Sequence, residues 1–329
     1  MERLINIFLT SRPKQQFKNI LVIIPFVLSA NLWIGISSQI ISNLVSDLLM
    51  GLASFVLGSW FIYIINDSVD KNTDKGHPEK SKRPIVSGKL SGKVIFATSL
   101  IILSSSLVIG FAVNTIFLFT LLAYLILMTL YSLYIKKLFF LDILSVASGY
   151  MLRVYAGAAI VTNNISNSLG VSVWLILCTG FASLFVLSIK RFSELNNDEL
   201  SKRSSLNISK FNSTFLNYSI NFSEFITYIS YAFYCISINF FSIFRGNTPS
   251  DLSLLLTLPL VIMGMRRFKK DSINSTYGDQ PEEVIFKSNF IKIIFITWII
   301  FSALIIYFRN LNFYTLVKFV NIHLLCQNI

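Results

Sequence analysis

The segment Asp47–Asp74, DLLMGLASFVLGSWFIYIINDSVDKNTD, joins an apolar run at 47–65 to three aspartates, Asp67, Asp70 and Asp74. A run of about nineteen residues can cross the hydrocarbon core of a bilayer as a single helix. If the helix continues, positions i, i+3 and i+7 fall within about 60° of one another, so the three carboxylates share one face. Because unpaired negative charge is costly at a membrane edge, this face predicts a cation site. The simpler alternative is a solvated helix end.

Carboxylates in this arrangement are typical of a magnesium site. Mg²⁺ is a hard cation that prefers oxygen ligands and usually bridges one or two carboxylates to the phosphates of a substrate. We therefore expect Asp67, Asp70 and Asp74 to bind Mg²⁺. The substrate at this end of the helix is then expected to carry phosphate.

The composition of the whole chain indicates a membrane protein. Of 329 residues, 54% are hydrophobic and 13% are charged, and 30 are phenylalanine. A soluble core cannot bury so much apolar surface. We predict an all-α polytopic membrane protein with a single domain over 1–329, a short basic N-terminal segment 1–18 and a C-terminal tail 310–329. About nine runs are long enough to cross a bilayer: 19–37, 47–65, 94–112, 115–135, 142–162, 171–189, 220–243, 251–265 and 290–308.

The positions of the 28 lysines and arginines predict the orientation of the chain. Most of them lie in the N-terminal segment and in the loop after every second predicted span, whereas the alternate loops hold few. By the positive-inside rule, the N-terminus and the aspartates face the cytoplasmic side of the cell membrane. The net charge of +12 is therefore explained by topology, the lipid bilayer and anionic ligands, without a nucleic-acid partner.

Basic side chains in two other cytoplasmic segments are candidates for binding the substrate. The loop Lys75–Gly88 is punctuated by glycine and proline and predicts a lid that faces phosphate. In it, Arg83 offers a planar fork and Lys80 a point charge to anionic oxygens. The sixth predicted span ends in KRFSEL at 190–195, which contributes the candidates Lys190, Arg191 and Glu194.

The fifth predicted span carries charge at two depths. Asp142 lies at its inner end, and Arg153 follows eleven residues later, about 16 Å along a helix and so near the middle of the membrane. An intramembrane arginine normally faces the protein interior and has a partner. Arg153 is therefore expected either to form a structural ion pair or to bind an anionic ligand that enters from the cytoplasmic side.

Together these residues resemble a known family, the UbiA superfamily of polytopic membrane transferases. In that superfamily NDxxDxxxD after the second span binds Mg²⁺-diphosphate, and here the motif is Asn66–Asp74. The segment RPIVSGKLS at 83–91 is similar to the RPxxSG segment that follows it. Within the superfamily, the chain most resembles the branch of decaprenyl-phosphate phosphoribosyltransferases. The segments that carry this resemblance are SRPKQQFKN at 11–19, HPEKSKRPIVSG at 77–88, LDILSVASGYMLRVYAGA at 141–158, KRFSEL at 190–195 and YGDQPEEV at 277–284.

The chain departs from the superfamily pattern in two places. Members that use prenyl diphosphates usually carry a second, DxxxD-like motif after the sixth span, where this chain has Lys190, Arg191 and Glu194. This departure favours the phosphoribosyl branch. The branch commonly has Asp-Arg after PEE, whereas this chain has Lys287-Ser288-Asn289, which leaves the function of the loop 277–289 open.

The branch implies transfer of 5-phosphoribose from phosphoribosyl diphosphate (PRPP) to a polyprenyl phosphate, with release of diphosphate, for cell-envelope polysaccharide synthesis. Asp67, Asp70 and Asn66 would be the catalytic residues, and Asn66 and Glu194 would position ribose hydroxyls or a metal-bound water. An anionic phosphate needs no strong base, but it does need to be positioned. The predicted substrate-binding residues are Lys18, Asp74, Lys80, Arg83, Asp142, Arg153, Lys190, Arg191 and Glu194.

Other functions remain open at this stage. A UbiA-type enzyme that transfers a prenyl group from its diphosphate to an aromatic acceptor would share the Mg²⁺ site. A cation-coupled transporter would need charge deep in several spans or inverted repeats, and we find one deep arginine and no clear repeat. A membrane scaffold leaves the clustered charges unexplained. The sequence decides neither the length of the polyprenyl carrier nor whether the protein is a homo-oligomer.

Overall fold

The computed structural model of the chain describes residues 2–29, 36–76, 80–138, 140–165, 172–196, 212–244, 252–275, 278 and 280–305. All regular secondary structure within these ranges is helical, as the composition predicts. The predicted tail 310–329 lies outside them.

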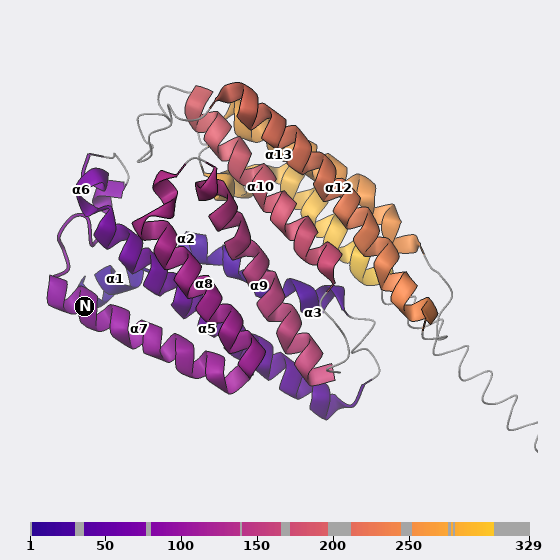
Figure 1. Cartoon of the computed structure of the whole chain (residues 1–329), viewed down its shortest axis with the longest axis horizontal. Coiled ribbons are helices and arrows are strands. Elements are labelled where there is room, and N and C mark those ends of the chain that lie inside the picture. The colour runs from indigo at the N-terminus through magenta and orange to yellow at the C-terminus, as the bar shows by residue number, and fades with distance from the viewer. Residues whose placement is uncertain are drawn as a thin grey trace, which may run out of the picture.

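Four long helices form the first half of the bundle (Figure 1): α5 (Ser38–Val69), α7 (Gly92–Val113), α8 (Thr115–Leu133) and α9 (Leu141–Ile165). Their apolar side chains meet in a core that includes Phe55, Phe117 and Ile160. Small residues let α5 approach α7 closely, since the hydroxyls of Ser54 and Ser106 each donate to the other's backbone carbonyl at 2.8 Å.

The second half contains α10 (Val173–Asn196), α12 (Ser213–Phe244) and α13 (Leu258–Asn274), which lie together on the other side of Figure 1. Before α13 comes the 3₁₀ turn η5 (Ser253–Thr257). After it, the short α14 (Pro281–Lys287) meets a last helix, Asn289–Ile305, at an angle of 86°. Phe185, Phe268 and Val284 belong to the core that joins α10, α13 and α14.

The N-terminal segment packs into the bundle as short helical pieces. They are α1 (Glu2–Leu9), α2 (Pro13–Gln16), the 3₁₀ turn η1 (Phe17–Val22) and α3 (Ile24–Leu28). A β-carbon on Gly157 of α9 would lie 1.9 Å from the carbonyl oxygen of Val22, so only glycine permits this approach. Gly157 thereby lets η1 bring Lys18 and Asn19 against α9.

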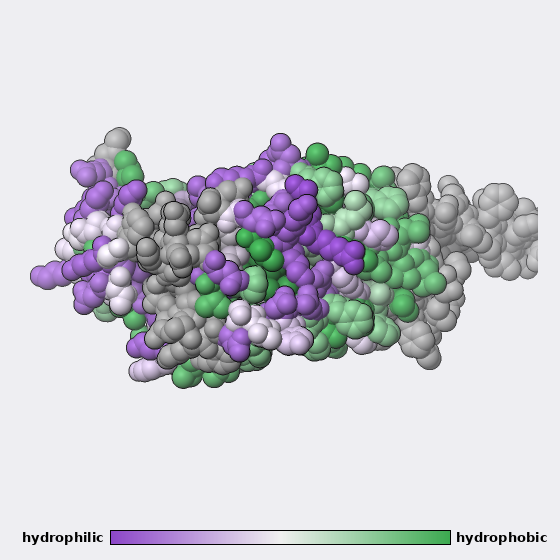
Figure 2. All heavy atoms as spheres, turned by 90° about the horizontal axis from the view of Figure 1, so that it is seen from above, coloured by the Kyte–Doolittle hydropathy of each residue, from purple (hydrophilic) through white to green (hydrophobic). Residues whose placement is uncertain are grey.

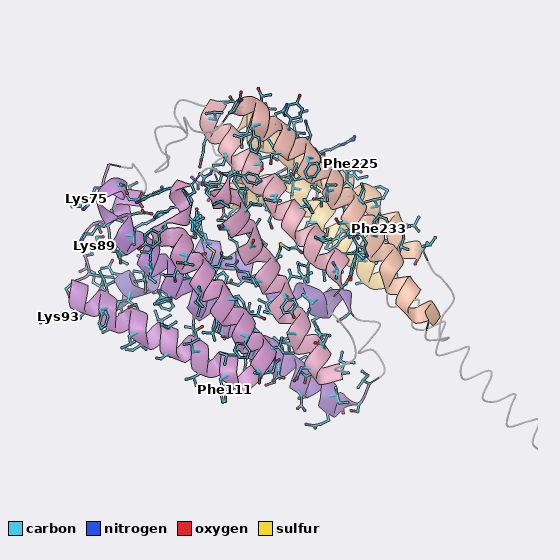
Figure 3. All side chains as sticks on the ribbon, in the orientation of Figure 1. Lys75, Lys89, Lys93, Phe111, Phe225 and Phe233 are labelled. Carbon is cyan, nitrogen blue, oxygen red and sulfur yellow. The ribbon has the colours of Figure 1, made fainter. Side chains whose placement is uncertain are left out.

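Three short elements complete the end of the bundle that holds the aspartates: α6 (Lys71–Asp74), η2 (Lys80–Lys82) and η3 (Ile135–Lys137). The view down on the molecule in Figure 2 shows hydrophilic residues gathered over part of the surface and hydrophobic residues over another. In Figure 3, Lys75 and Lys89 lie at the end that carries α6, whereas Phe225 lies on the outer side of α12. Phe225 is 61% exposed, as expected of a side chain that faces lipid.

The predicted count of nine spans is not confirmed. Five helices in the described ranges are long and apolar enough to cross a membrane: α5, α7, α8, α9 and α10. A sixth qualifies if α14 and the last helix count as one bent span. The predicted span 19–37 is not one helix in its described part, because η1 ends at Val22 and α3 begins with Pro25 among its first residues. The predicted span 251–265 includes η5, so α13 has only 17 residues.

Candidate active site

Asp67 lies at the centre of a group of charged side chains at the end of α5. Its carboxylate is 1% exposed and forms ion pairs with Arg12, which follows α1, and with Arg83, whose Nη1 lies 2.8 Å from Oδ1. The same Nη1 lies 3.4 Å from Oδ2 of Asp74, and Nζ of Lys80 lies 3.5 Å from Oδ1 of Asp74. Arg83 therefore joins the first and third aspartates of the motif.

Asp70 takes a different partner. Helix α5 ends at Val69, and Asp70 has φ −87° and ψ 4°, outside helical geometry, before α6 begins at Lys71. Its Oδ1 lies 2.5 Å from Nζ of Lys136 in η3. The expected single helical face is thus interrupted at the middle aspartate. Asn66 lies half-buried next to Asp67, and its carbonyl oxygen accepts the amide of Asp70 at 2.9 Å.

These carboxylates have the right chemistry for a hard cation, but basic side chains hold them in the present arrangement. Asp74 Oδ1 is buried, and the ammonium of Lys80 at 3.5 Å forms a long ion pair with it rather than a hydrogen bond. Among those residues, no three His, Cys, Asp or Glu side chains lie close enough together to hold a metal ion. Oxygen donors, one of them held only by this long ion pair, fit Mg²⁺ once the arginines and lysines turn toward a bound substrate.

Burial shifts the pKa values of the two basic residues in the loop. Burial lowers the pKa of Lys80; Asp74 opposes this effect, and the charges of Arg83 and Lys190 add to it. Burial also lowers the pKa of Arg83, and the neighbouring Arg12 lowers it further, against the raising effect of Asp67. Each cation is therefore crowded by other cations. An anionic ligand would relieve this repulsion.

The wall provided by α10 contains a compact ion cluster. Arg191 donates to Asp142 at 2.6 Å and to Glu194 at 2.7 Å. Both carboxylates are buried, with side chains 3% and 6% exposed. The structure thus brings three predicted site residues together and explains two of them as partners of Arg191. Lys190, the preceding residue, lies within electrostatic range of Glu194 first, and also of Lys18 and Glu282, and its charge reaches Lys80.

Lys18 is held by a residue that the sequence analysis did not assign. Its Nζ lies 2.6 Å from Oε1 of Glu282 in α14, and Lys14 pairs with Glu283 at 3.0 Å. The rings of Phe17 and Phe286 meet edge to face at 5.6 Å. The described part of the loop 277–289 therefore docks α14 on the N-terminal segment.

Arg153 is buried and hydrogen-bonded to neutral groups. Its Nε donates to Oδ1 of Asn19 and its Nη2 to the hydroxyl of Tyr124, both at 2.8 Å, while its Nη1 donates to the carbonyl of Gly149 at 2.9 Å. The guanidinium also lies over the rings of Tyr124 and Tyr150, at 4.6 and 5.5 Å. No carboxylate in the described ranges pairs with it, so the structural ion pair considered from the sequence is not found.

Sequence reasoning missed several residues of this site: Arg12, Asn19, Tyr124, Lys136 and Glu282. Pro13 follows Arg12, and a residue before proline normally takes an extended backbone conformation, so no local signal indicated the position of Arg12. Arg12 takes the left-handed conformation, with φ 50° and ψ 67°, which is uncommon for a residue with a side chain. This conformation ends α1 before α2 begins and directs Arg12 to Asp67.

The fold and the site define a class: a polytopic α-helical membrane protein with buried carboxylates and cations at one end of its bundle. The model of the UbiA prenyltransferase family matches residues 22–290, and the chain belongs to this family. A UbiA homologue from Archaeoglobus fulgidus, solved with GPP and Mg²⁺, has the same fold, with a TM-score of 0.66 at 18% identity. That match covers 92% of this chain and 99% of the other.

Two curated relatives extend the comparison across nearly the whole chain. The decaprenyl-phosphate phosphoribosyltransferase of Mycolicibacterium smegmatis is 26% identical over 302 residues, which are 90% of this chain and 91% of that protein. The protein of the same name from Corynebacterium glutamicum is 24% identical and covers 90% of this chain and 85% of its own length. The predicted resemblance to this branch of the family is thus confirmed.

Proposed function

We propose that the protein transfers a 5-phosphoribosyl group from PRPP to a polyprenyl phosphate and releases diphosphate. The observation that carries this proposal is the near full-length similarity to proteins named decaprenyl-phosphate phosphoribosyltransferase. The α10 wall supports it: a cation clamp, Arg191 with Asp142 and Glu194, stands where prenyl-diphosphate enzymes of the family are expected to carry a second acidic motif.

Asp67, Asp70 and Asp74 are the proposed ligands of Mg²⁺. When bound, the cation would neutralise the charge that develops on the departing diphosphate. The contribution of the protein's own side chains is that two arginines would change their binding partners. Arg12 and Arg83, which now hold Asp67, would turn to the diphosphate oxygens and release the carboxylate. Arg83 suits this task because its planar fork matches a phosphate as well as a carboxylate.

The basic residues on the other side would hold the two remaining phosphates. Lys190 and Lys18 lie within electrostatic range of each other and are proposed to bind the ribose 5-phosphate and the acceptor phosphate. Arg153 lies deeper than these two lysines. Tyr150 is close to both Lys18 and Arg153 and so connects the two cations. An anionic phosphate is already a nucleophile, so these cations act by positioning it in line with C1 of the ribose. Asn66 and Glu194 remain our proposed contacts for ribose hydroxyls.

The same proposal fixes where the reaction takes place. The lysine-rich end of the bundle is expected to face the cytoplasm, where PRPP is soluble, and the polyprenyl tail is expected to lie in the bilayer between helices. The product would serve as a lipid-linked pentose donor for cell-envelope polysaccharides. The protein would then be a multi-pass protein of the cell membrane.

Two parallel assays test the proposal. Purified protein with Mg²⁺ receives radiolabelled PRPP and polyprenyl phosphate in one assay, and a prenyl diphosphate and 4-hydroxybenzoate in the other. We expect the label of PRPP to move into the lipid phase in the first assay and no prenylated 4-hydroxybenzoate to form in the second. Prenylated 4-hydroxybenzoate in the second would instead assign a prenyltransferase activity, as the family name suggests, with an aromatic acceptor.

A further inference from the structure

A column of polar side chains runs from Asp67 along the inner face of α5 toward the middle of the membrane. Tyr63 and Ser59 lie four and eight residues before Asp67, so the three side chains fall within about 80° of one another and span about 12 Å. The guanidinium of Arg12, the partner of Asp67, lies over the ring of Tyr63 at 4.9 Å. Ser59 is fully buried, and its hydroxyl donates to Asn19 at 3.0 Å. The column therefore continues the carboxylate site into the bundle.

Arg153 lies at the deep end of this column without a counter-charge. It bonds to Asn19, to Tyr124 on α8 and to the carbonyl of Gly149, all neutral acceptors, and no carboxylate in the described ranges pairs with it. Helices α8 and α9, which carry Tyr124 and Arg153, both pack on α5 (Figure 1). The three bonds use three of the five N–H donors of a guanidinium. Arg153 is 5% exposed, and a charge buried to this degree is costly unless an anion pairs with it, so this end of the column favours an anion.

The column is open beside Lys18. Tyr63 and Tyr150 are each half-buried, although Tyr63 lies between two buried residues of its face and Tyr150 lies beside the buried Arg153. Both rings are within electrostatic range of Lys18, whose side chain is 28% exposed. The surface that these side chains leave uncovered therefore lies between the carboxylate site and Arg153. Because Glu282 already pairs with Lys18, the unbalanced charge there is that of Arg153.

We propose that Arg153 binds the phosphate of the polyprenyl acceptor, on the membrane side of the ribose of PRPP. This inference rests on the proposed function. A lipid acceptor enters from the bilayer and reaches a cation at this depth, whereas the diphosphate of PRPP stays with the aspartates at the end of the bundle. The column length of about 12 Å leaves room for the ribose between the two phosphate sites. The acceptor oxygen then faces C1 of the ribose from the side opposite to the diphosphate.

This arrangement suits a direct displacement at C1. A phosphate oxygen of the acceptor forms the new bond to C1, and the bond from C1 to the diphosphate oxygen breaks. The diphosphate leaves with the electron pair of that bond, and no proton is transferred. Arg153 contributes by holding the nucleophile within attack distance. Lys18 then faces the same acceptor phosphate, and Lys190 remains for the ribose 5-phosphate.

The first test measures binding of radiolabelled polyprenyl phosphate without PRPP, so that the result does not depend on turnover. An excess of unlabelled polyprenol removes binding that depends on the tail alone. Arg153→Gln loses a charge-assisted hydrogen bond and should weaken binding about 10- to 100-fold. Arg153→Lys keeps the charge and should restore part of the affinity. In steady-state assays, the KM for polyprenyl phosphate should rise in Arg153→Gln, whereas the KM for PRPP should not.

Asn19→Asp separates binding from a structural role. The variant keeps the arginine but places a carboxylate where Nε of Arg153 now donates to an amide oxygen at 2.8 Å. With its charge compensated, Arg153 should bind polyprenyl phosphate about tenfold more weakly, while the melting temperature in detergent should not fall. Asn221→Asp is the matched control outside the site. It places a carboxylate against Lys269, whose Nζ lies 2.8 Å from Oδ1 of Asn221, and should leave binding unchanged.

The possible failures point to different conclusions. Equal affinity of the wild-type protein and Arg153→Gln for polyprenyl phosphate would overturn this assignment and leave the proposed function intact. A wild-type protein that does not bind polyprenyl phosphate would overturn both. A rise in the KM for PRPP alone would assign Arg153 to the ribose 5-phosphate instead. Loss of binding in step with loss of stability in both Arg153→Gln and Asn19→Asp would show that the network only holds the helices together.

Discussion

The two walls of the site contain similar charges but balance them in different ways. On the α5 wall, Asp67 and Asp70 are held by cations from distant segments, 55 and 66 residues away in sequence. On the α10 wall, Arg191 pairs with a carboxylate of its own helix and one from α9. An anionic substrate can draw the first set of cations away one by one. The Arg191 cluster is a closed clamp, because without the arginine its two buried carboxylates would repel each other.

The charges on the α5 wall are therefore suited to binding, and those in the Arg191 clamp to structure. Carboxylates whose cations can leave are suited to receive a metal ion. A buried cation between two buried carboxylates is suited to hold helices together, because removing any one partner leaves uncompensated charge. We therefore expect substitutions on the α5 wall to affect activity first, and substitutions in the Arg191 clamp to affect stability first.

The largest effect is expected for Asp67→Asn. It removes a proposed metal ligand together with the partner of Arg12 and Arg83, and activity should fall by about 10³-fold or more. Transfer of label from PRPP measures the loss. Asp47→Asn is the matched control on the same helix, because Asp47 lies outside the site and accepts from Asn164 at 2.8 Å. Comparable activity of the two variants would refute the metal assignment.

Substitution of Arg191 should act on stability. Arg191→Met leaves Asp142 and Glu194 buried without their cation, which should cost about 3–5 kcal/mol of the free energy of unfolding. Thermal unfolding in detergent measures this. The triple variant Arg191→Met, Asp142→Asn, Glu194→Gln removes all three charges and should regain most of the lost stability. If the triple variant is as unstable as the single variant, the clamp is not the source of the effect.

Lys190→Gln tests the neighbouring residue on the same wall. Lys190 is not part of the clamp, so the melting temperature should change little. Loss of a charge-assisted bond to a phosphate should raise the KM for PRPP about tenfold. Steady-state kinetics at saturating polyprenyl phosphate separate this from an effect on kcat. A fall in stability equal to that of Arg191→Met would place Lys190 in the clamp and contradict the division within this wall.

The same contrast explains what could be predicted from the sequence. Helices α5, α7, α8, α9 and α10 agree with predicted spans because each is a continuous apolar run, and an apolar run is a local signal. The broken N-terminal span could not be predicted in this way, because its short pieces depend on packing against α9. The Asp motif and its opposite wall were likewise local patterns. Arg83 and Lys80 were predicted to meet the phosphate of a substrate, and the structure pairs them with the carboxylates of the motif.

The partners of the motif were not predictable from local pattern. Arg12 and Lys136 reach Asp67 and Asp70 across more than fifty positions of sequence, and only the packing of η1, α5 and α8 brings them together. Glu282 was hidden for the same reason, because its partner Lys18 lies at the other end of the chain. Local spacing therefore gives the carboxylate motif and the charged residues of the opposite wall, but not the distant residues that pair with them.

The smallest effect is expected for the pH dependence of Lys80 on the α5 wall. Burial lowers the pKa of Lys80, so in the free protein it loses its proton at a lower pH than an ordinary lysine. Binding of diphosphate requires the protonated amine of Lys80. As pH increases, the KM for PRPP should therefore rise, and this rise should start at a lower pH than the titration of exposed lysines. The rise should be about two- to fivefold, because Lys80 is partly exposed to solvent.

Lys80→Arg separates this titration from others in the site. An arginine keeps its charge across the accessible pH range, so the variant should have a flat KM where the wild-type KM rises. As pH increases, PRPP binding by the wild-type protein should weaken, whereas the stability of the free protein should increase. Below its lowered pKa, charged Lys80 is a cost to folding, and the wild-type protein should gain stability as pH rises through that value. If the KM for PRPP had the same pH dependence in both proteins, another group would be responsible for the titration, and the charge of Lys80 would not affect PRPP binding.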